Sequence, residues 1–207
     1  TAADSVAYLP DHVEKHDYVH VSKGIENVLL NGAWDADIYG GGGASRLVGN
    51  AGANTIKGFD GDDVLDGRGG VNRLEGGRGA DTYLIDTGLD GVDTIADADG
   101  PDALTANTLR FKGVDRADLA IARDGSEVSF SVDEVLRAEI VGYDADGPVF
   151  HVATDDARFD LFGVNHAPRL NPDWASPFLE PEAPHWSVSE GGIDQLPLSA
   201  DLFVDVD

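Results

Sequence analysis

Large apolar residues recur at a nine-residue interval in the first half of this chain, and glycines recur in step with them. Five nonapeptides follow one another without a gap, starting at Gly40, Gly49, Gly58, Gly67 and Gly76. Each has Gly at positions 1 and 4, and Ser, Asn or Asp at position 6. Position 8 is always large and apolar: Leu47, Ile56, Leu65, Leu74 and Tyr83. A fixed period of this length predicts a solenoid.

Less regular copies precede these five. Residues 31–39 keep Ile38 at position 8, and residues 22–30 place Leu29 there. Two nonapeptides make one coil, with a short strand on each side and a Gly-rich turn at each edge. Turns from alternate repeats therefore stack on the same edge. Eroded end repeats are expected, because a terminal coil has a neighbour on one side only.

Beyond the repeats, residues 82–86 and 92–97 predict the strands that end the solenoid. From 107 to 165, six short β-type runs are split by Asp-Gly turns at 124–125 and 146–147, which predicts antiparallel strands. The predicted fold class is all-β, a parallel β-roll with an antiparallel β C-terminal cap. Four segments are expected: an N-terminal flank (1–21), the β-roll (22–99), the cap (100–165), and a Pro-rich linker with the incomplete start of a further module (166–207).

Charge narrows the range of partners. The chain has 39 acidic and 14 basic residues, a formal net charge of −25. This argues against nucleic acid and anionic membrane surfaces, which both need Lys and Arg. The chain has no Cys, which excludes disulfides and thiolate metal sites, and no Met, which indicates a piece of a longer chain. No apolar run is long enough to span a membrane. Acids interleaved with Gly at a fixed period favour cation binding, and we expect a monomeric module.

Two features would make such a roll unstable without a ligand, and bound calcium would offset both. Each nonapeptide buries about one large apolar side chain but must order nine residues, several of them Gly. The position-6 acids also repel one another. Ca²⁺ takes six to eight oxygen ligands, which Gly-rich turns supply as carbonyls and position 6 supplies as a carboxylate. Several Ca²⁺ ions are therefore expected, each between turns that stack on the same edge.

The strongest site is expected where the turn 58–63 faces the turn 76–81, with Asp63 and Asp81 as carboxylate ligands. The candidate donors there are Gly58, Asp60, Asp62, Asp63, Gly76, Arg78, Ala80 and Asp81. A weaker site is expected where 49–54 faces 67–72, because Asn offers only neutral oxygens: Gly49, Ala51, Asn54, Gly67, Gly69 and Asn72. Residues 40–45 facing 58–63 should bind more weakly still. A further acidic cluster follows the repeats: Asp90, Asp93, Asp97 and Asp99.

The nonapeptides resemble the RTX family, the repeat modules of bacterial proteins exported by type I secretion. The segments GIENVLLNG (24–32) and GADTYLIDTGLDGVDTIAD (79–97) resemble the flanks of such blocks. The resemblance implies binding of extracellular calcium, export as an unfolded chain, and a secreted or cell-surface location. Ser45, Asn54 and Asn72 depart from the Asp of the family pattern. The stretch 189–207 resembles the opening of a cadherin-like, immunoglobulin-type module.

These patterns favour a calcium-binding structural module of a large, adhesin-like bacterial protein, and not an enzyme. Neither a nucleophile elbow nor a P-loop ending is present. Two alternatives stay open: an accessory module of a secreted enzyme (a protease, a lipase or a polysaccharide-modifying enzyme), and a glycan- or protein-binding adhesion surface on 100–165. A separate question is whether His12, His16 and His20, spaced by four, hold a metal such as zinc.

Overall fold

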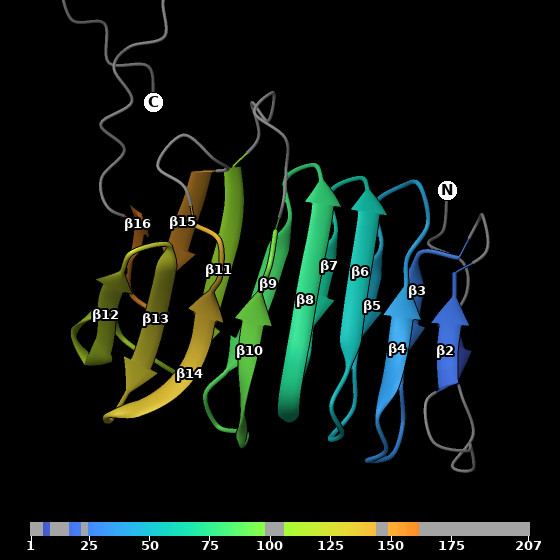
Figure 1. The fold of residues 1–207 in the computed structure, drawn as a ribbon, viewed down its shortest axis with the longest axis horizontal. Coiled ribbons are helices and arrows are strands. Elements are labelled where there is room, and N and C mark those ends of the chain that lie inside the picture. The colour runs from blue at the N-terminus through green and yellow to red at the C-terminus, as the bar shows by residue number, and fades with distance from the viewer. Residues whose placement is uncertain (1–5, 9–16, 22–24, 98–105, 144–148, 162–207) are drawn as a thin grey trace, which may run out of the picture. The chain divides into compact units, whose positions relative to one another are not determined.

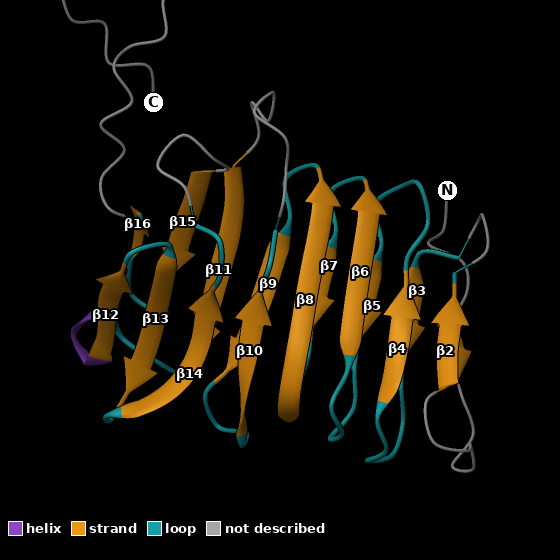
Figure 2. Cartoon of the chain, viewed as in Figure 1, coloured by secondary structure: helices purple, strands orange, loops and turns teal. Residues whose placement is uncertain are grey.

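In the computed structural model, almost every described element is a β-strand, and the strands form two sheets (Figures 1 and 2). The described residues are 6–8, 17–21, 25–97, 106–143 and 149–161. Residues 166–207 lie outside them.

Sheet A contains, in spatial order, β1 (Val6–Tyr8), β3 (Asn27–Leu29), β5 (Arg46–Val48), β7 (Val64–Asp66), β9 (Thr82–Asp86), β11 (Ala106–Lys112), β15 (Val149–Ala153) and β16 (Arg158–Asp160). Sheet B contains β2 (Asp17–His20), β4 (Ala36–Tyr39), β6 (Thr55–Asp60), β8 (Gly70–Arg78), β10 (Gly91–Ile95), β14 (Val135–Ile140), β13 (Glu127–Val132) and β12 (Leu119–Asp124). A short 3₁₀ turn, η1 (Arg116–Asp118), leads into β12.

Through the repeats the chain alternates between the two sheets, and each strand pairs in parallel with the strand one coil away. In sheet A, Leu47 pairs with Leu65, which pairs with Tyr83. In sheet B, Ile38 pairs with Ile56, which pairs with Leu74. The predicted parallel β-roll is therefore confirmed, with two nonapeptides to each coil.

The position-8 residues form the core between the sheets. All five side chains from Leu47 to Tyr83 are 0% exposed, and each such burial stabilises the fold by about 1.5–3 kcal/mol. The two apolar columns continue beyond the repeats: Ile95 pairs with Leu74, and Leu109 pairs with Tyr83. The core is thus a single stack, one large side chain thick on each side.

A sixth nonapeptide, which the sequence analysis missed, occupies residues 88–96. It has Gly88, Gly91, Asp93 and Ile95 at positions 1, 4, 6 and 8. β10 pairs with β8 so that Gly91 faces Gly70 and Asp93 faces Asn72. Three extra residues, 85–87, precede this repeat and break the nine-residue phase. They lengthen β9 and its turn while leaving the stacking of the coils unchanged.

The cap combines both strand directions. β14 pairs in parallel with β10, and β15 pairs in parallel with β11, so the roll continues into the cap. Antiparallel pairing appears only further out, between β12 and β13, β13 and β14, and β15 and β16. The predicted Asp-Gly turn at 124–125 joins β12 to β13. The predicted turn at 146–147 lies outside the described residues.

The strands before the repeats also stack in parallel, β1 on β3 and β2 on β4. Parallel pairing therefore includes strands before residue 22. The predicted core position of Leu29 is wrong: Val28 pairs with Leu47 and is buried, while Leu29 is half-buried. In this register the copy spans 21–29 and has Gly24 at position 4, so the predicted copy 22–30 was one residue out of phase. A shift of one residue exchanges the two faces of a strand.

Candidate calcium site

The turns of the roll form two separate edges. Edge 1 consists of the turns that lead from sheet A to sheet B, at residues 31–35, 49–54, 67–72 and 87–90. Edge 2 consists of the turns that lead from sheet B to sheet A, at residues 40–45, 58–63 and 76–81. The structure therefore stacks the same turns that the repeat period pairs.

On edge 2 the position-6 side chains link neighbouring coils. The backbone N–H of Ser45 donates to Oδ1 of Asp63 at 2.7 Å, and the N–H of Asp63 donates to Oδ1 of Asp81 at 2.8 Å. The N–H of Asp81 donates in turn to Oδ1 of Asn107 at 2.7 Å. Sequence reasoning missed Asn107 because it lies 26 residues after Asp81 and has no glycine pattern. Only the pairing of Thr108 with Thr82 reveals its position-6 role.

The second carboxylate oxygen of Asp63 is the strongest indication of a metal site. Oδ2 of Asp63 is buried and accepts no hydrogen bond from the part of the chain that the structure describes. It faces the space beside Gly58: a Cβ there would lie 2.6 Å from the carbonyl oxygen of Gly76 and closer still to this Oδ2. Two oxygens from neighbouring turns thus converge where no side chain fits. A buried carboxylate oxygen and a carbonyl suit Ca²⁺, which takes oxygen ligands at about 2.3–2.6 Å.

Burial also raises the pKa of Asp63 to about 6, and the neighbouring Asp62 adds to the rise. A raised carboxyl pKa means that the charged form lacks compensation from the protein alone. A bound dication supplies that compensation and returns the group to its ionised state.

The other predicted donors of this site lie on the same two turns. Asp60 pairs with Arg78 at the end of the β6–β8 ladder, and the carbonyl of Arg78 accepts from the N–H of Gly61. The side chain of Asp62 accepts from the N–H of Ala80 at 2.8 Å. The structure brings the two turns together, with the Asp62 carboxylate already engaged in joining them.

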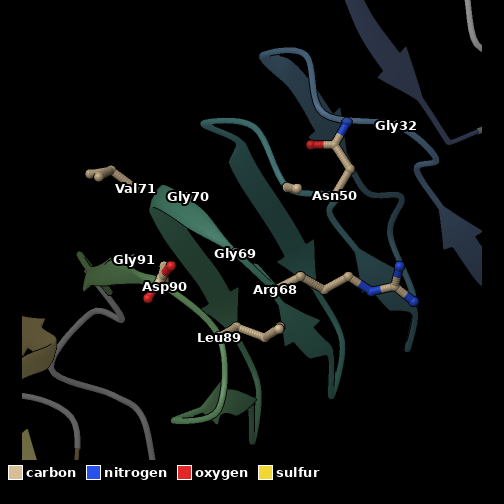
Figure 3. A pocket seen from close by; sticks show the side chains of 10 residues that line it. Gly32, Asn50, Arg68, Gly69, Gly70, Val71, Leu89, Asp90 and Gly91 are labelled. Atoms are coloured by element: carbon tan, nitrogen blue, oxygen red, sulfur yellow. The ribbon is translucent and has the colours of Figure 1, made fainter.

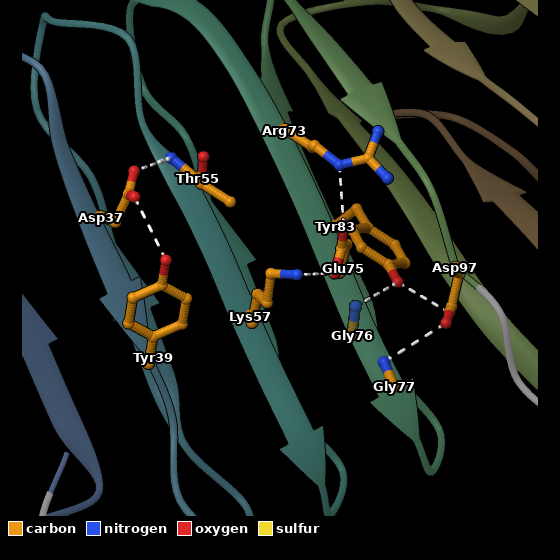
Figure 4. A network of polar contacts seen from close by, with 10 residues as sticks. All are labelled: Asp37, Tyr39, Thr55, Lys57, Arg73, Glu75, Gly76, Gly77, Tyr83 and Asp97. Carbon is orange, nitrogen blue, oxygen red and sulfur yellow. Dashed lines mark hydrogen bonds and ion pairs between the residues drawn. The ribbon is translucent and has the colours of Figure 1, made fainter. Parts of the chain in front are cut away.

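A polar network closes edge 2 after the turn 76–81 (Figure 4). The hydroxyl of Tyr83 donates to Oδ2 of Asp97 at 2.7 Å and accepts from the N–H of Gly76 at 2.9 Å. Oδ1 of Asp97 accepts from the N–H of Gly77, and its Oδ2 also accepts from Asn107. Asp97 therefore covers the last glycine turn. Burial, with the Asp97 carboxylate beside it, raises the pKa of Tyr83 well above its usual value.

Replacing Tyr83 with Phe should lower the free energy of unfolding by about 1–3 kcal/mol, because it leaves the buried N–H of Gly76 and the Asp97 carboxylate without their shared partner. Urea denaturation in saturating calcium measures this. Tyr39→Phe is the matched control: Tyr39 is half-buried and bonds Asp37 at 3.3 Å, so its loss should cost less than about 0.5 kcal/mol. Equal effects of the two variants would show that the Tyr83 network adds nothing.

Edge 1 is built differently, from amides. Asn54 and Asn72 are buried, and Oδ1 of Asn72 accepts from the backbone N–H of Asn54. The side chain of Asn54 bonds Asn50 in its own turn and the carbonyl of Ala36. Asn50, which sequence reasoning missed, donates to the carbonyl of Trp34. Figure 3 shows the outside of this edge, where a groove of about 780 Å³ runs over Gly69 and the other glycine turns. The groove also takes in Ala51, Arg68, Leu89 and Asp90. Gly49 and Gly67 stack as predicted, with the carbonyl of Gly67 2.8 Å from a Cβ placed on Gly49.

The acidic residues after the repeats are divided between the edges. Asp90 and Asp93 lie at the edge-1 end of β10, while Asp97 follows its edge-2 end. The structure therefore does not bring these three together, since a strand separates them, and Asp99 lies outside the described residues. Asp93 is buried against Asn72, and burial raises its pKa to about 7.

Asp93 gives the metal-free protein an unusual pH dependence. Its folded pKa of about 7 lies above the ordinary value, so protonation favours the fold. That stabilisation is complete below the unfolded pKa of about 4 and is lost as the pH rises through 7. In the calcium-stripped protein, Asp93 should raise the free energy of unfolding by on the order of 1–3 kcal/mol between pH 7.5 and pH 5.

Far-ultraviolet circular dichroism of the calcium-stripped protein at several pH values measures this gain, as a rise in β signal on acidification. Asp93→Asn removes the group with the higher pKa and should reduce the slope, while Asp63, with a pKa of about 6, still titrates in the same direction. Glu75 and Asp86, whose pKa values are lowered by Lys and Arg partners, titrate below this window. A metal-free protein that loses stability on acidification from pH 7.5 to pH 5 would contradict the expectation.

Comparison with known families now adds a decisive observation. The family described as RTX calcium-binding nonapeptide repeat matches residues 39–74 and 66–82, in four copies. These residues are RTX repeats. The match covers the turns 40–45, 49–54, 58–63, 67–72 and 76–81, with Asp63 and Asp81 among them, and RTX repeats bind Ca²⁺. The RTX resemblance drawn from the nonapeptides is thereby confirmed.

Other comparisons add less. The solution structure of the AlgE6R3 subunit from the Azotobacter vinelandii mannuronan C5-epimerase is similar at 19% identity, over 94% of this chain and 99% of that chain, with a TM-score of 0.37. A TM-score this low carries no argument about this chain. No curated protein matches significantly.

Two further observations concern the surroundings of the RTX repeats. Within the described ranges, no helix has the length and apolar character needed to cross a bilayer. Of the three spaced histidines, His20 lies on strand β2, where its ring stacks on Tyr39. His12 and His16 lie outside the described residues, so a metal site there stays a question.

Proposed function

We propose that this RTX module is a calcium-triggered structural element of a large secreted or cell-surface bacterial protein, which folds and stiffens when the chain meets extracellular calcium. The observation that carries the proposal is the buried Oδ2 of Asp63. It faces the carbonyl of Gly76 across a space that only Gly58 leaves open. A calcium ion bound there would join two coils, which is a structural role and suits an adhesin-like protein.

Two turns would hold the strongest ion. Asp63 and Asp81 would supply carboxylate oxygens, and the backbone of 58–63 and 76–81 would supply carbonyls. Asp63 and Asp81 are each nearly fully buried, at 1% exposure, and each already links two coils through Oδ1. A dication there would neutralise like charges and tie neighbouring coils together.

Calcium concentration would decide when the roll forms. Extracellular calcium modules bind with dissociation constants of about 10⁻⁴–10⁻³ M, so the sites would stay empty inside the cell and fill outside it. Because the sites exist only in the stacked coils, the free energy of binding becomes free energy of folding. This sequence of events suits export as an unfolded chain by type I secretion.

A calcium titration followed by far-ultraviolet circular dichroism tests the proposal. We expect the β signal to rise cooperatively with calcium in the millimolar range or below, and to be lost on adding a chelator. Magnesium is the control, because it keeps its waters and demands a tighter geometry. A spectrum and melting temperature that are the same with calcium and with chelator would overturn the proposal.

A further inference from the structure

Asp63 on edge 2 and Asn72 on edge 1 occupy the same position of the repeat, and their side chains differ by a single atom. On both edges, Oδ1 accepts a hydrogen bond from the backbone of the preceding coil: Asp63 from Ser45 at 2.7 Å, and Asn72 from Asn54 at 2.9 Å. The second atom of Asp63 is an acceptor oxygen, whereas that of Asn72 is an N–H₂ group.

On edge 1 the amide hydrogens bond to the oxygens around them. Nδ2 of Asn72 donates to the carbonyl of Gly69 at 3.2 Å and to Oδ1 of Asp93 at 2.9 Å. Nδ2 of Asn54 donates to the carbonyl of Ala36 at 2.8 Å and to Oδ1 of Asn50. On edge 1, side-chain N–H groups therefore bond to backbone carbonyls and side-chain oxygens of the stacked coils.

Asn50 extends the same arrangement by one coil. Its Nδ2 donates to the carbonyls of Trp34 at 3.0 Å and Asn31 at 3.4 Å, and its Oδ1 accepts from the N–H of Gly52 at 2.8 Å. Carbonyls of the edge-1 turns are thus turned toward amide donors. Backbone carbonyl oxygens such as these are also ligands for Ca²⁺.

The space beside the position-1 glycine shows the exchange directly. Beside Gly67 on edge 1, a Cβ would meet Nδ2 of Asn72 at 2.5 Å and, at 2.7 Å, the Oδ1 of Asp93 that accepts from this Nδ2. Beside Gly49 it would meet the carbonyl of Gly67 and Oδ1 of Asn54, which accepts from the N–H of Asn50. Beside Gly58 on edge 2, it would meet the Oδ2 of Asp63, which has no donor among the described residues. The side-chain oxygens in these edge-1 spaces thus have hydrogen-bond donors, whereas the Oδ2 of Asp63 on edge 2 has none among the described residues.

We propose that the amides of Asn50, Asn54 and Asn72 replace calcium on edge 1, so that the turns 49–54 and 67–72 are held without metal and position 6 decides edge by edge where an ion binds. The proposal rests on the proposed calcium role of edge 2 for its contrast, and it makes a separate claim about edge 1. It is the alternative to the predicted weaker calcium site at Asn54 and Asn72, and a count of bound ions decides between the two.

An isosteric exchange tests it on the full chain. Native mass spectrometry in excess calcium counts the bound ions for wild type, Asn72→Asp and Asp63→Asn. We expect Asn72→Asp to gain one ion, because it restores a carboxylate oxygen, and Asp63→Asn to lose one, because its new N–H₂ satisfies the same turn. The melting temperature of Asp63→Asn should also become less sensitive to chelator than that of wild type.

Asn72→Ala separates ligation from hydrogen bonding. If the amide replaces calcium, this variant keeps the wild-type ion count, and its melting temperature falls by a similar amount in saturating calcium and at a calcium concentration just above the folding midpoint. Loss of an ion in Asn72→Ala would show that Asn72 is a ligand and would overturn the proposal. So would an unchanged count in a folded Asn72→Asp. If the wild type instead shows no rise in β signal during the calcium titration, the proposed function is wrong.

Discussion

Asp63→Ala combined with Asp81→Ala should raise the calcium concentration at the midpoint of folding by at least about tenfold, because calcium affinity depends on the number of charged ligands. The two carboxylates are the buried acids of adjacent edge-2 turns. Their removal also breaks the bonds from Ser45 and Asp63 backbone N–H groups. Circular dichroism during a calcium titration measures the midpoint.

Glu127→Ala is the matched control for lost negative charge. Glu127 is exposed on β13, away from both edges, so its removal should leave the midpoint unchanged. A double variant that folds at the wild-type calcium concentration would show that the strongest site lies elsewhere in the chain. A shift of equal size in the control would mean that net charge, and not ligation, sets the midpoint.

Gly91→Ala should lower the free energy of unfolding by roughly 3–5 kcal/mol, through backbone strain and overpacking together. Gly91 has φ +136°, and a Cβ there would overlap the carbonyl oxygen of Gly70, with the carbonyl carbon at 2.7 Å. Relief of this overlap requires β10 to move away from β8. Urea denaturation in saturating calcium measures the loss.

Gly43→Ala gives a comparison at the same repeat position. Gly43 is position 4 of the first nonapeptide, as Gly91 is of the sixth, but a Cβ on Gly43 meets nothing within 4 Å. Its replacement should change stability by less than about 0.5 kcal/mol. Similar losses in both variants would argue that glycine is needed at position 4 for a reason other than the contact with Gly70.

The apolar phase of the repeats was sufficient to predict the roll and its core. In the five regular repeats, Leu65 and its counterparts at position 8 are buried as expected, because the space between the two sheets is where a large apolar side chain escapes water. The pairing of the turns on each edge followed from the same period. The six β-type runs of the cap also correspond to strands β11 to β16.

Features outside the strict period escaped prediction. The sixth repeat was hidden by residues 85–87, which displace Asp93 by three positions while the coils stay in register. Asn107 follows a longer connection and has no glycine to mark it. The parallel start of the cap depends on long-range pairing of β14 and β15, which local alternation does not encode. The amide network of edge 1 depends on which atom faces which carbonyl, and only coordinates show that.

Strand reversal at β16 has a consequence for crowding. An edge strand that ran parallel to the roll would offer a second molecule the same ladder that the coils use among themselves. In sheet A, β16 runs antiparallel to β15 and has only three residues. In sheet B, β12 runs in the same direction as β10, because two antiparallel pairings separate β12 from β14. A neighbouring copy that docked at this end would therefore meet a strand of matching direction in one sheet only, and could not extend both sheets of the roll at once.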